Sequence, residues 1–165
     1  MTTIEDTIVY RTEVLAFSGT PLGDRQDRAS LIHEAHEIVT QCSVLVGEIT
    51  IEEGSAHMTR NDAYAQGMGR IVFAPTDIRR HIAVHEIAHI VHARSNLRGR
   101  SHGQEWRGVY ATMLGIVYGS RYEELIREAF RINGLFVQDV NLGTSAPPII
   151  QLDVFAAATQ RTRWL

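Results

Sequence analysis

The sequence predicts an α+β domain in which a small sheet packs on one long helix and further helices follow. Two observations support the sheet, because residues 44–52 (VLVGEITIE) and 70–74 (RIVFA) are short β-branched runs typical of strands. A third observation supports the helices, because beyond Pro75 the apolar residues recur at helical rather than strand spacing.

The N-terminal part is predicted to be helical. Apolar residues over 4–17 recur at a spacing that suits a helix better than a strand, and a second helical pattern extends from about Asp27 to Cys42. The stretch between them, SGTPLGDR, is rich in turn residues and separates the two helices.

The long helix is expected over 77–94, with Thr76 and Asp77 as its N-cap and acidic first turn. After a polar loop, two more helical patterns cover 104–118 and 121–132, the second closed by a turn signal. The sequence therefore places most of its helical residues in the second half of the chain.

The chain of 165 residues fits one domain over 1–140 and an arm over 141–165. The segment GTSAPPII within this end contains a Pro-Pro pair, which breaks regular structure. We therefore expect residues 141–165 to form an extended C-terminal arm.

The composition is that of an ordinary globular protein, with 44% hydrophobic and 21% charged residues and a formal net charge of -3. No apolar run approaches a membrane span, and the acidic start MTTIEDTIVY is unlike a secretory signal, so we expect a cytoplasmic protein without a membrane partner. This charge gives no overall attraction for nucleic acid, and the sequence indicates no oligomeric state.

The single cysteine, Cys42, excludes an intramolecular disulfide and every multi-cysteine zinc motif. His, Asp and Glu are the remaining candidates for metal ligands. Histidine is the unusual residue type here, with eight in the chain and several of them clustered.

The clearest motif is HEIAH at 85–89. His85 and His89 lie about 40° from each other around a helix and can bind one ion. Glu86 lies about 100° from His85, where it can reach a water in the open coordination position. The pattern predicts zinc-dependent hydrolysis, in which Zn²⁺ lowers the pKa of its water to about 7 and Glu86 takes the proton.

A catalytic zinc site needs a third protein ligand, which should come from a following element. His102 fits this requirement, because it lies 13 residues after His89, next to Gly103 and at the start of the next predicted helix. Glu105 is the alternative third ligand, since carboxylates also bind zinc.

Other interpretations of this helix stay open. Its histidines share one stripe, which would also suit a histidine-rich surface or a set of core side chains, and pairs 81/85 and 89/92 also have metal-binding spacing. Only the 85/89 pair has a glutamate directly after its first member, which favours that pair. His81 and His92 are then expected to flank the site or to be plain surface residues.

With both blocks in view, the sequence resembles the zincin metallopeptidases and, among them, the SprT-like group. The signature of that group is HExxH, a loop and then H-G-x-E-W/F, which here read HEIAH at 85–89 and HGQEW at 102–106. The resemblance implies a zincin-like fold and a zinc site with His102 as third ligand. It also implies that Glu105 belongs to the motif without being a ligand.

A wider resemblance, from Val9 through Gly134, is to an uncharacterised metallohydrolase family of actinobacteria and their phages. Its VYxxE-type start reads here as Val9, Tyr10 and Glu13. The chain differs from many SprT-like proteins in lacking a cysteine-rich zinc ribbon, which weakens the expectation of their DNA-associated role.

Two further features lie close to the predicted site. Tyr110 falls two turns after His102 on the same helical face, where it would serve as a core residue or as a donor to a developing oxyanion. Arg100, a candidate auxiliary residue, belongs to a basic cluster that is most simply solvated surface, with binding of an acidic substrate or nucleic acid as the less favoured alternative. The other members of this cluster are Arg94, Arg98 and Arg107.

Together these observations predict a zinc-dependent metallohydrolase, and they favour a peptidase that cleaves amide bonds in a peptide or protein substrate. Two alternatives stay open. One is a non-catalytic, metal-stabilised binding or regulatory module, which would close the metal with a fourth protein ligand. The other is hydrolysis of a non-peptide bond, because the site chemistry fixes the nucleophile and leaves the substrate open.

Overall fold

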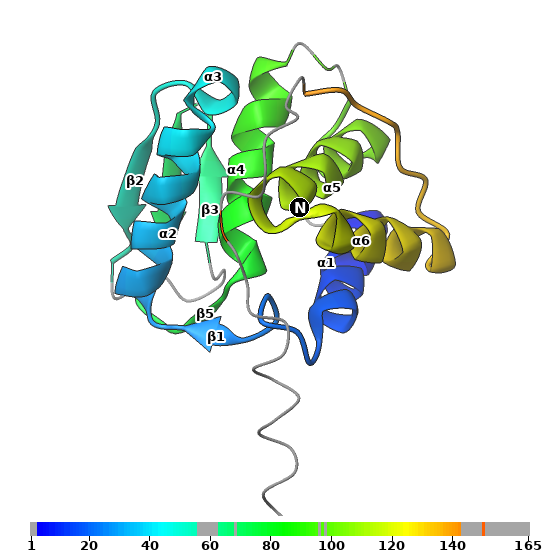
Figure 1. Cartoon of the computed structure of the whole chain (residues 1–165), viewed down its shortest axis with the longest axis horizontal. Coiled ribbons are helices and arrows are strands. Elements are labelled where there is room, and N and C mark those ends of the chain that lie inside the picture. The colour runs from blue at the N-terminus through cyan, green and yellow to red at the C-terminus, as the bar shows by residue number, and fades with distance from the viewer. Residues whose placement is uncertain are drawn as a thin grey trace, which may run out of the picture.

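Helix α4 lies in the middle of the fold, with the larger sheet on one side of it and helices on the other (Figure 1). The helices are α1 (Ile4–Phe17), α2 (Arg28–Gln41), α3 (Ser43–Val46), α4 (His81–Arg94), α5 (Gln104–Tyr118) and α6 (Ser120–Ile132). The strands are β1 (Arg25–Gln26), β2 (Thr50–Glu53), β3 (Ala63–Gln66), β4 (Arg70–Phe73) and β5 (Ile78–Arg79). This computed structural model describes residues 3–55, 63–67, 69–95, 97, 99–142 and 150. The mixed α+β class that the sequence predicts is confirmed.

Helix α4 is buried on nearly all sides. It packs against α5 on one side and against α2, α3 and β3 on the other. Its sequence is apolar around most of its circumference, as expected for an interior helix, yet His85 and Glu86 are buried within it. Polar side chains at such positions require partners, because an unpaired buried polar group destabilises the fold.

The larger sheet has the strand order β2-β4-β3. Strand β2 is parallel to β4, with Ile51 opposite Ile71, and β3 is antiparallel to β4, with Tyr64 opposite Val72. Strand β3 also packs on α4, so it lies at the sheet edge closest to the HEIAH motif. Sequence patterns did not predict β3, because its residues AYAQ lack the β-branched run that marks β4.

The prediction of a strand over 44–52 is wrong in its first half. The chain forms α3 there, ends it at Gly47 with a φ of 63°, and begins β2 only at Thr50. The amide of Thr50 donates to the carbonyl of Gly69 at 2.7 Å, directly before β4 starts. A strand needs a neighbour to pair with, and the register of β4 supplies one only from Thr50 onward. The strand predicted over 70–74 is confirmed as β4.

The predicted helix start at Thr76 and Asp77 is also wrong, because α4 begins at His81. The two residues before Arg80 form β5, which pairs antiparallel with β1. The amide of His81 then donates to the carbonyl of Leu22 at 3.1 Å. A backbone carbonyl from a distant loop thus satisfies a free amide of the helix, which local sequence cannot reveal.

The remaining helices agree with the sequence. The helices predicted over 4–17 and 104–118 are confirmed as α1 and α5, and the one over 27–42 is α2 with Asp27 as its N-cap. The helix over 121–132 is α6, which begins one residue earlier. Each of these helices carries its own apolar period or cap, so its formation is visible locally.

The core lies between α4 and the elements that surround it. Its largest fully buried side chains include Trp106, Tyr110, Phe17, Phe73 and Phe130. Cys42 belongs to the same cluster, and burial raises the pKa of its thiol to about 11. The lone cysteine is therefore a packing residue.

The arm predicted over 141–165 falls outside the described residues, except for 141, 142 and 150. The segment that precedes this arm contacts α5, because the amide of Gln138 donates to the carbonyl of Gln104 at 3.1 Å. In the described part of the chain, every helix is too short or too polar to cross a membrane.

Gly108 marks the close approach of this segment to α5, because a Cβ there would overlap the carbonyl oxygen of Gln138. We expect Gly108→Ala to lower the free energy of unfolding by about 1–3 kcal/mol, although alanine is the better helix former by about 1 kcal/mol. In the matched control, Gly115→Ala, the new methyl meets the flexible side chain of Glu123, so stability should stay near wild type. Urea unfolding measures both, and equal effects would contradict the close contact.

Candidate metal centre

Three histidine side chains converge in the interior, two from α4 and one from the loop before α5. The Nε2 atom of His85 lies 3.3 Å from that of His89 and 3.2 Å from that of His102. One ligand atom of each lies within 4.8 Å of the others. Ligand atoms on one tetrahedral ion, with metal–nitrogen bonds of about 2.0–2.1 Å, are about 3.3 Å apart. The structure thus brings together the three histidines that the sequence predicts, at a spacing that suits one metal ion.

The backbone at His102 has an uncommon conformation. Its φ is 59°, and among the described residues no other non-glycine residue has a positive φ. Arg107 Nη1 donates to its carbonyl at 2.7 Å, and the next residue, Gly103, lies so close to Arg100 that a Cβ would be 2.9 Å from the Arg100 carbonyl oxygen. Conformations of this kind concentrate at functional sites. Here the turn directs the imidazole back toward His85.

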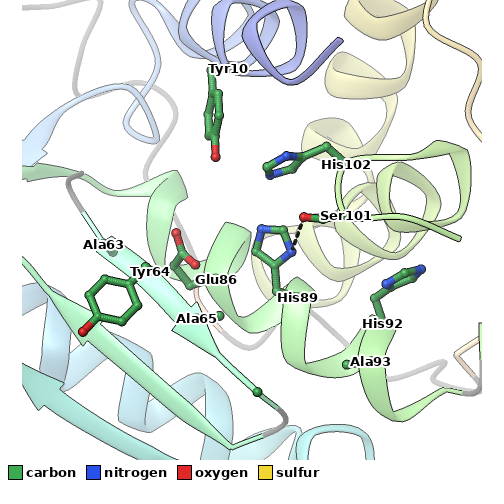
Figure 2. A pocket seen from close by; sticks show the side chains of 11 residues that line it. Tyr10, Ala63, Tyr64, Ala65, Glu86, His89, His92, Ala93, Ser101 and His102 are labelled. Carbon is green, nitrogen blue, oxygen red and sulfur yellow. Dashed lines mark hydrogen bonds between the residues drawn. The ribbon is translucent and has the colours of Figure 1, made fainter. Parts of the chain in front are cut away.

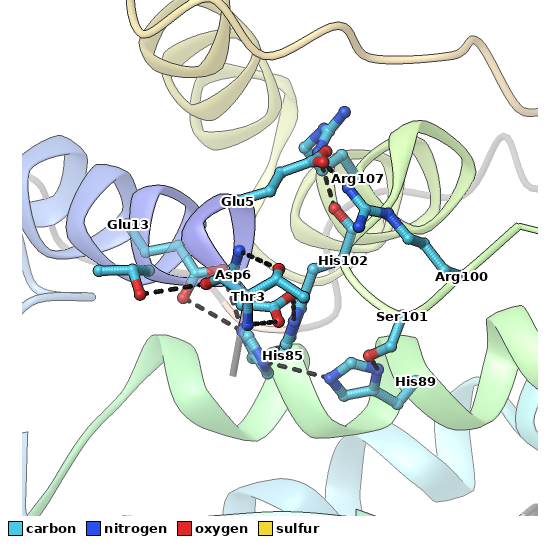
Figure 3. A network of polar contacts seen from close by, with 11 residues as sticks. Thr3, Glu5, Asp6, Glu13, His85, His89, Arg100, Ser101, His102 and Arg107 are labelled. Atoms are coloured by element: carbon cyan, nitrogen blue, oxygen red, sulfur yellow. Dashed lines mark hydrogen bonds and ion pairs between the residues drawn. The ribbon is translucent and has the colours of Figure 1, made fainter. Parts of the chain in front are cut away.

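Two of the three rings are held by carboxylates through their other nitrogen, Nδ1 (Figure 3). The carboxylate of Glu13 lies 2.9 and 3.1 Å from Nδ1 of His85. Asp6 Oδ1 lies 3.1 Å from Nδ1 of His102. A carboxylate behind an imidazole fixes its tautomer and orientation and leaves the Nε2 lone pair for a metal.

Both carboxylates come from α1 and share one face of it. The spacing of Asp6, Tyr10 and Glu13 corresponds to i, i+4 and i+7 on a helix. Asp6 is fixed by a capping box, in which the Thr3 amide donates to Asp6 at 2.7 Å and the Asp6 amide donates to Thr3 Oγ1 at 3.1 Å. Burial acts to raise the pKa of Asp6, but the hydrogen bonds from Thr3 and His102 outweigh it and lower that pKa. Asp6 therefore faces His102 as a charged group.

Sequence reasoning missed the role of these carboxylates. Glu13 and Tyr10 entered only through a family resemblance, and Asp6 was not singled out. The available signal was a pair of acidic residues seven apart on a helix whose face is otherwise apolar. Nothing local says what they bind, because His85 lies 72 residues from Glu13 and His102 lies 96 residues from Asp6.

Burial keeps the imidazoles of His85 and His89 neutral. It lowers the pKa of His85 well below the ordinary value and that of His89 to about 2, and the neighbouring histidines act in the same direction. The hydroxyl of Ser101 lies 3.5 Å from Nδ1 of His89 (Figure 2). The neutral imidazole is the form that binds metal, so protons compete only weakly for these nitrogens.

Glu13 is fully buried between two histidines. Burial raises the pKa of its carboxyl to about 7, whereas His81 and His102 act to lower it. Its nearest contact is the ring of His85, and Nδ1 of His81 lies 3.8 Å away. Glu13 therefore connects the candidate ligand His85 to a second, deeper imidazole.

Glu86 lines a cavity of about 350 Å³ together with His89 and His102 (Figure 2). Its carboxylate accepts a hydrogen bond from the amide of Ala65 in β3. Burial raises the pKa of Glu86 to about 8, and the Ala65 amide acts against this rise. A cation bound by the imidazoles would act in the same direction as the Ala65 amide and lower the pKa of Glu86. Glu86 thus lies beside the converging nitrogens without being one of the group.

Tyr110 and His81 lie behind the site. Tyr110 is fully buried, stacks on Trp106 with ring centroids 5.1 Å apart, and has its hydroxyl 3.4 Å from Nδ1 of His81. Among the described residues, neither belongs to the lining of the cavity. Their positions favour the core interpretation of both residues over a substrate-facing one.

His92 lines the cavity at the far end of α4, whereas Glu105 faces the loop. Glu105 accepts a hydrogen bond from the Gly99 amide, and its Oε2 lies 3.9 Å from Nε2 of His92. It is not a member of the converging group, which contains His102 instead. The geometry therefore favours His102 over Glu105 as third ligand.

The basic cluster is partly neutralised. Arg100 and Arg107 both form ion pairs with Glu5 on α1. Arg94 donates to the carbonyl of Glu48 at 2.7 Å, and Arg98 falls outside the described residues. Arg100 thus helps to attach α1 to the loop that carries His102.

Comparisons of this chain with protein-family models, with curated proteins and with solved structures found no match. The geometry of the site itself is therefore the basis for assigning a function.

The first prediction separates the two candidates for third ligand. His102→Asn removes the imidazole but tolerates the positive φ, so we expect zinc affinity to fall by more than the 10–100-fold typical of losing an outer-shell partner. Glu105→Gln should keep zinc at one ion per chain. Competition with a chromogenic chelator measures both affinities. The reverse outcome would make Glu105 the ligand.

The second prediction concerns the carboxylate behind His85. Glu13→Gln keeps the size of the side chain but removes the charge, so we expect zinc affinity to fall about 10–100-fold. Glu128→Gln, an exposed position on α6 paired with Arg131, is the matched control and should bind zinc like wild type. Equal affinities of the two variants would show that Glu13 does not support the site.

Proposed function

We propose that the protein is a zinc-dependent hydrolase that cleaves amide bonds in peptides, on a zincin-like fold. The observation that carries this proposal is the convergence of the Nε2 atoms of His85, His89 and His102, with Glu86 lining the same cavity as His89 and His102. Imidazole nitrogens at this spacing suit zinc, which binds nitrogen ligands tetrahedrally at short distances.

The number of ligands supports a catalytic rather than a structural site. A structural zinc ion is normally closed by four protein ligands, whereas a catalytic one has three and leaves a position for water. Within the described residues, the converging group contains three side chains. His89 and His102 line the cavity, so a substrate could reach an ion held by these histidines.

The residues around the site have different roles in the proposed hydrolysis. Zinc, when bound, supplies a Lewis acid that polarises the carbonyl and acidifies water. Glu86 takes a proton from the attacking water and returns it to the leaving nitrogen. The amide of Ala65 holds the Glu86 carboxylate in place, and Asp6 and Glu13 hold the imidazoles.

Strand β3 supports a peptide as the substrate. Among the described strands, it lies at the edge of its sheet, has β4 on one side, and contributes residues 63–65 and Gly67 to the lining of the cavity. An edge strand can pair with an extended chain through backbone hydrogen bonds. A peptide bound along β3 would pass directly in front of Glu86. The pairing of Arg100 and Arg107 with Glu5 weakens the case for a nucleic acid at this site.

Glu86→Gln tests the proposal. We expect this variant to keep one zinc ion per chain but to cleave a peptide library at least 100-fold more slowly than wild type, because proton transfer is lost. The control Glu37→Gln, on the exposed face of α2, should retain full activity. Mass spectrometry of the digest, with and without chelator, gives the rates.

Two outcomes would contradict the proposal in different ways. A Glu86→Gln protein with unchanged cleavage would remove Glu86 from the reaction. A zinc-loaded wild type that cleaves no peptide would favour a non-catalytic module or a hydrolase of another bond.

A further inference from the structure

Tyr10 on α1 reaches into the cavity from the side opposite the sheet. Its ring stacks on His85, with centroids 5.4 Å apart and planes 19° apart, and meets the ring of His102 edge-on at 5.0 Å. Figure 2 shows the phenol hydroxyl pointing into the space between Glu86 and the imidazoles. A hydrogen-bond donor is thus directed at the region where a substrate carbonyl would lie.

The position of Tyr10 is set by the same contacts that orient the candidate ligands. Asp6 lies one turn before it and Glu13 about one turn after it on the same helical face, and each is bonded to a ligand imidazole. A residue between two such attachment points on a helix is held more precisely than one on a loop. Tyr10 therefore has a defined place relative to the metal site.

The proposed reaction needs a donor at this place. When water adds to the carbonyl carbon, a C–O bond forms, the C=O π pair moves onto the carbonyl oxygen, and the water proton goes to Glu86. Donors aimed at this developing charge stabilise the transition state more than the substrate. A phenol hydroxyl can donate such a hydrogen bond.

We propose that Tyr10 is a catalytic residue, whose hydroxyl donates a hydrogen bond to the oxyanion that forms on the scissile carbonyl. This inference rests on the proposed hydrolase function. It assigns to a residue of α1 the role of oxyanion donor, for which Tyr110 was a candidate from the sequence. The Tyr110 hydroxyl is instead buried against His81.

Tyr10→Phe and Tyr122→Phe form a matched pair, because the hydroxyl of Tyr122 on α6 is buried, has no hydrogen-bond partner within the described residues and lies outside the cavity lining. Phenylalanine keeps the ring that packs on His85. We expect kcat for a library peptide to fall about 100-fold or more in Tyr10→Phe, with KM and zinc content unchanged. Tyr122→Phe should behave like wild type. Full activity of Tyr10→Phe would overturn the inference.

A second measurement does not depend on peptide cleavage. Inorganic phosphate is a tetrahedral anion, and its binding to the cobalt-loaded protein can be followed by visible absorption. Loss of one hydrogen bond to a charged oxygen should weaken phosphate binding about tenfold or more in Tyr10→Phe and leave it unchanged in Tyr122→Phe. The cobalt spectrum without phosphate should be the same in all three proteins.

The outcomes separate this inference from the proposed function. Equal phosphate affinities of wild type and Tyr10→Phe, or none in either, would overturn the role of Tyr10, as would a changed cobalt spectrum before phosphate is added. Phosphate binding that depends on Tyr10, in a wild type that cleaves no peptide, would support the donor and refute the peptidase.

Discussion

Imidazoles with their Nε2 atoms about 3 Å apart do not stay together unaided, because neutral rings gain little from facing lone pairs toward one another. What holds two of them is the bond from each Nδ1 to a carboxylate of α1, Glu13 behind His85 and Asp6 behind His102. The carboxylates also depend on the imidazoles, because a fully buried carboxyl such as that of Glu13 is strongly destabilising without partners. A cation among the Nε2 atoms would strengthen both bonds by polarising the rings.

This constraint connects the N-terminus of the chain to its centre. Helix α1 is attached to the site by Asp6 and Glu13 and to the following loop by the pairs of Glu5 with Arg100 and Arg107. A metal that binds the native arrangement but not the unfolded chain stabilises the fold in proportion to its binding free energy. The stability of α1 against α4 and the occupancy of the site are therefore linked properties.

Features that depend on neighbouring residues in the chain could be predicted, whereas those that depend on distant ones could not. Helices α1, α2 and α5 have apolar residues at helical spacing in their own sequence. The pairing of residues 85 and 89 follows from helical geometry, and a later histidine supplies the third ligand that zinc needs. The start of α4 depends on the carbonyl of Leu22, and β2 begins only where β4 lies beside it. The partners of the imidazoles come from a helix that begins about eighty residues earlier. The spacing of apolar residues along the sequence gives no information about such long-range contacts.

The surroundings of the His85 ring show why Tyr10 suits the proposed catalytic role and Tyr110 does not. On the α5 side the ring meets Trp106 at 4.7 Å and Tyr110 at 5.6 Å, both fully buried, so this side excludes water and substrate. On the α1 side it meets Tyr10, which borders the cavity and is 43% exposed. A group that acts on a substrate must lie on the open side. The helical-face argument brought Tyr110 correctly near the metal site, but a helix position alone cannot say which side of the ring is open.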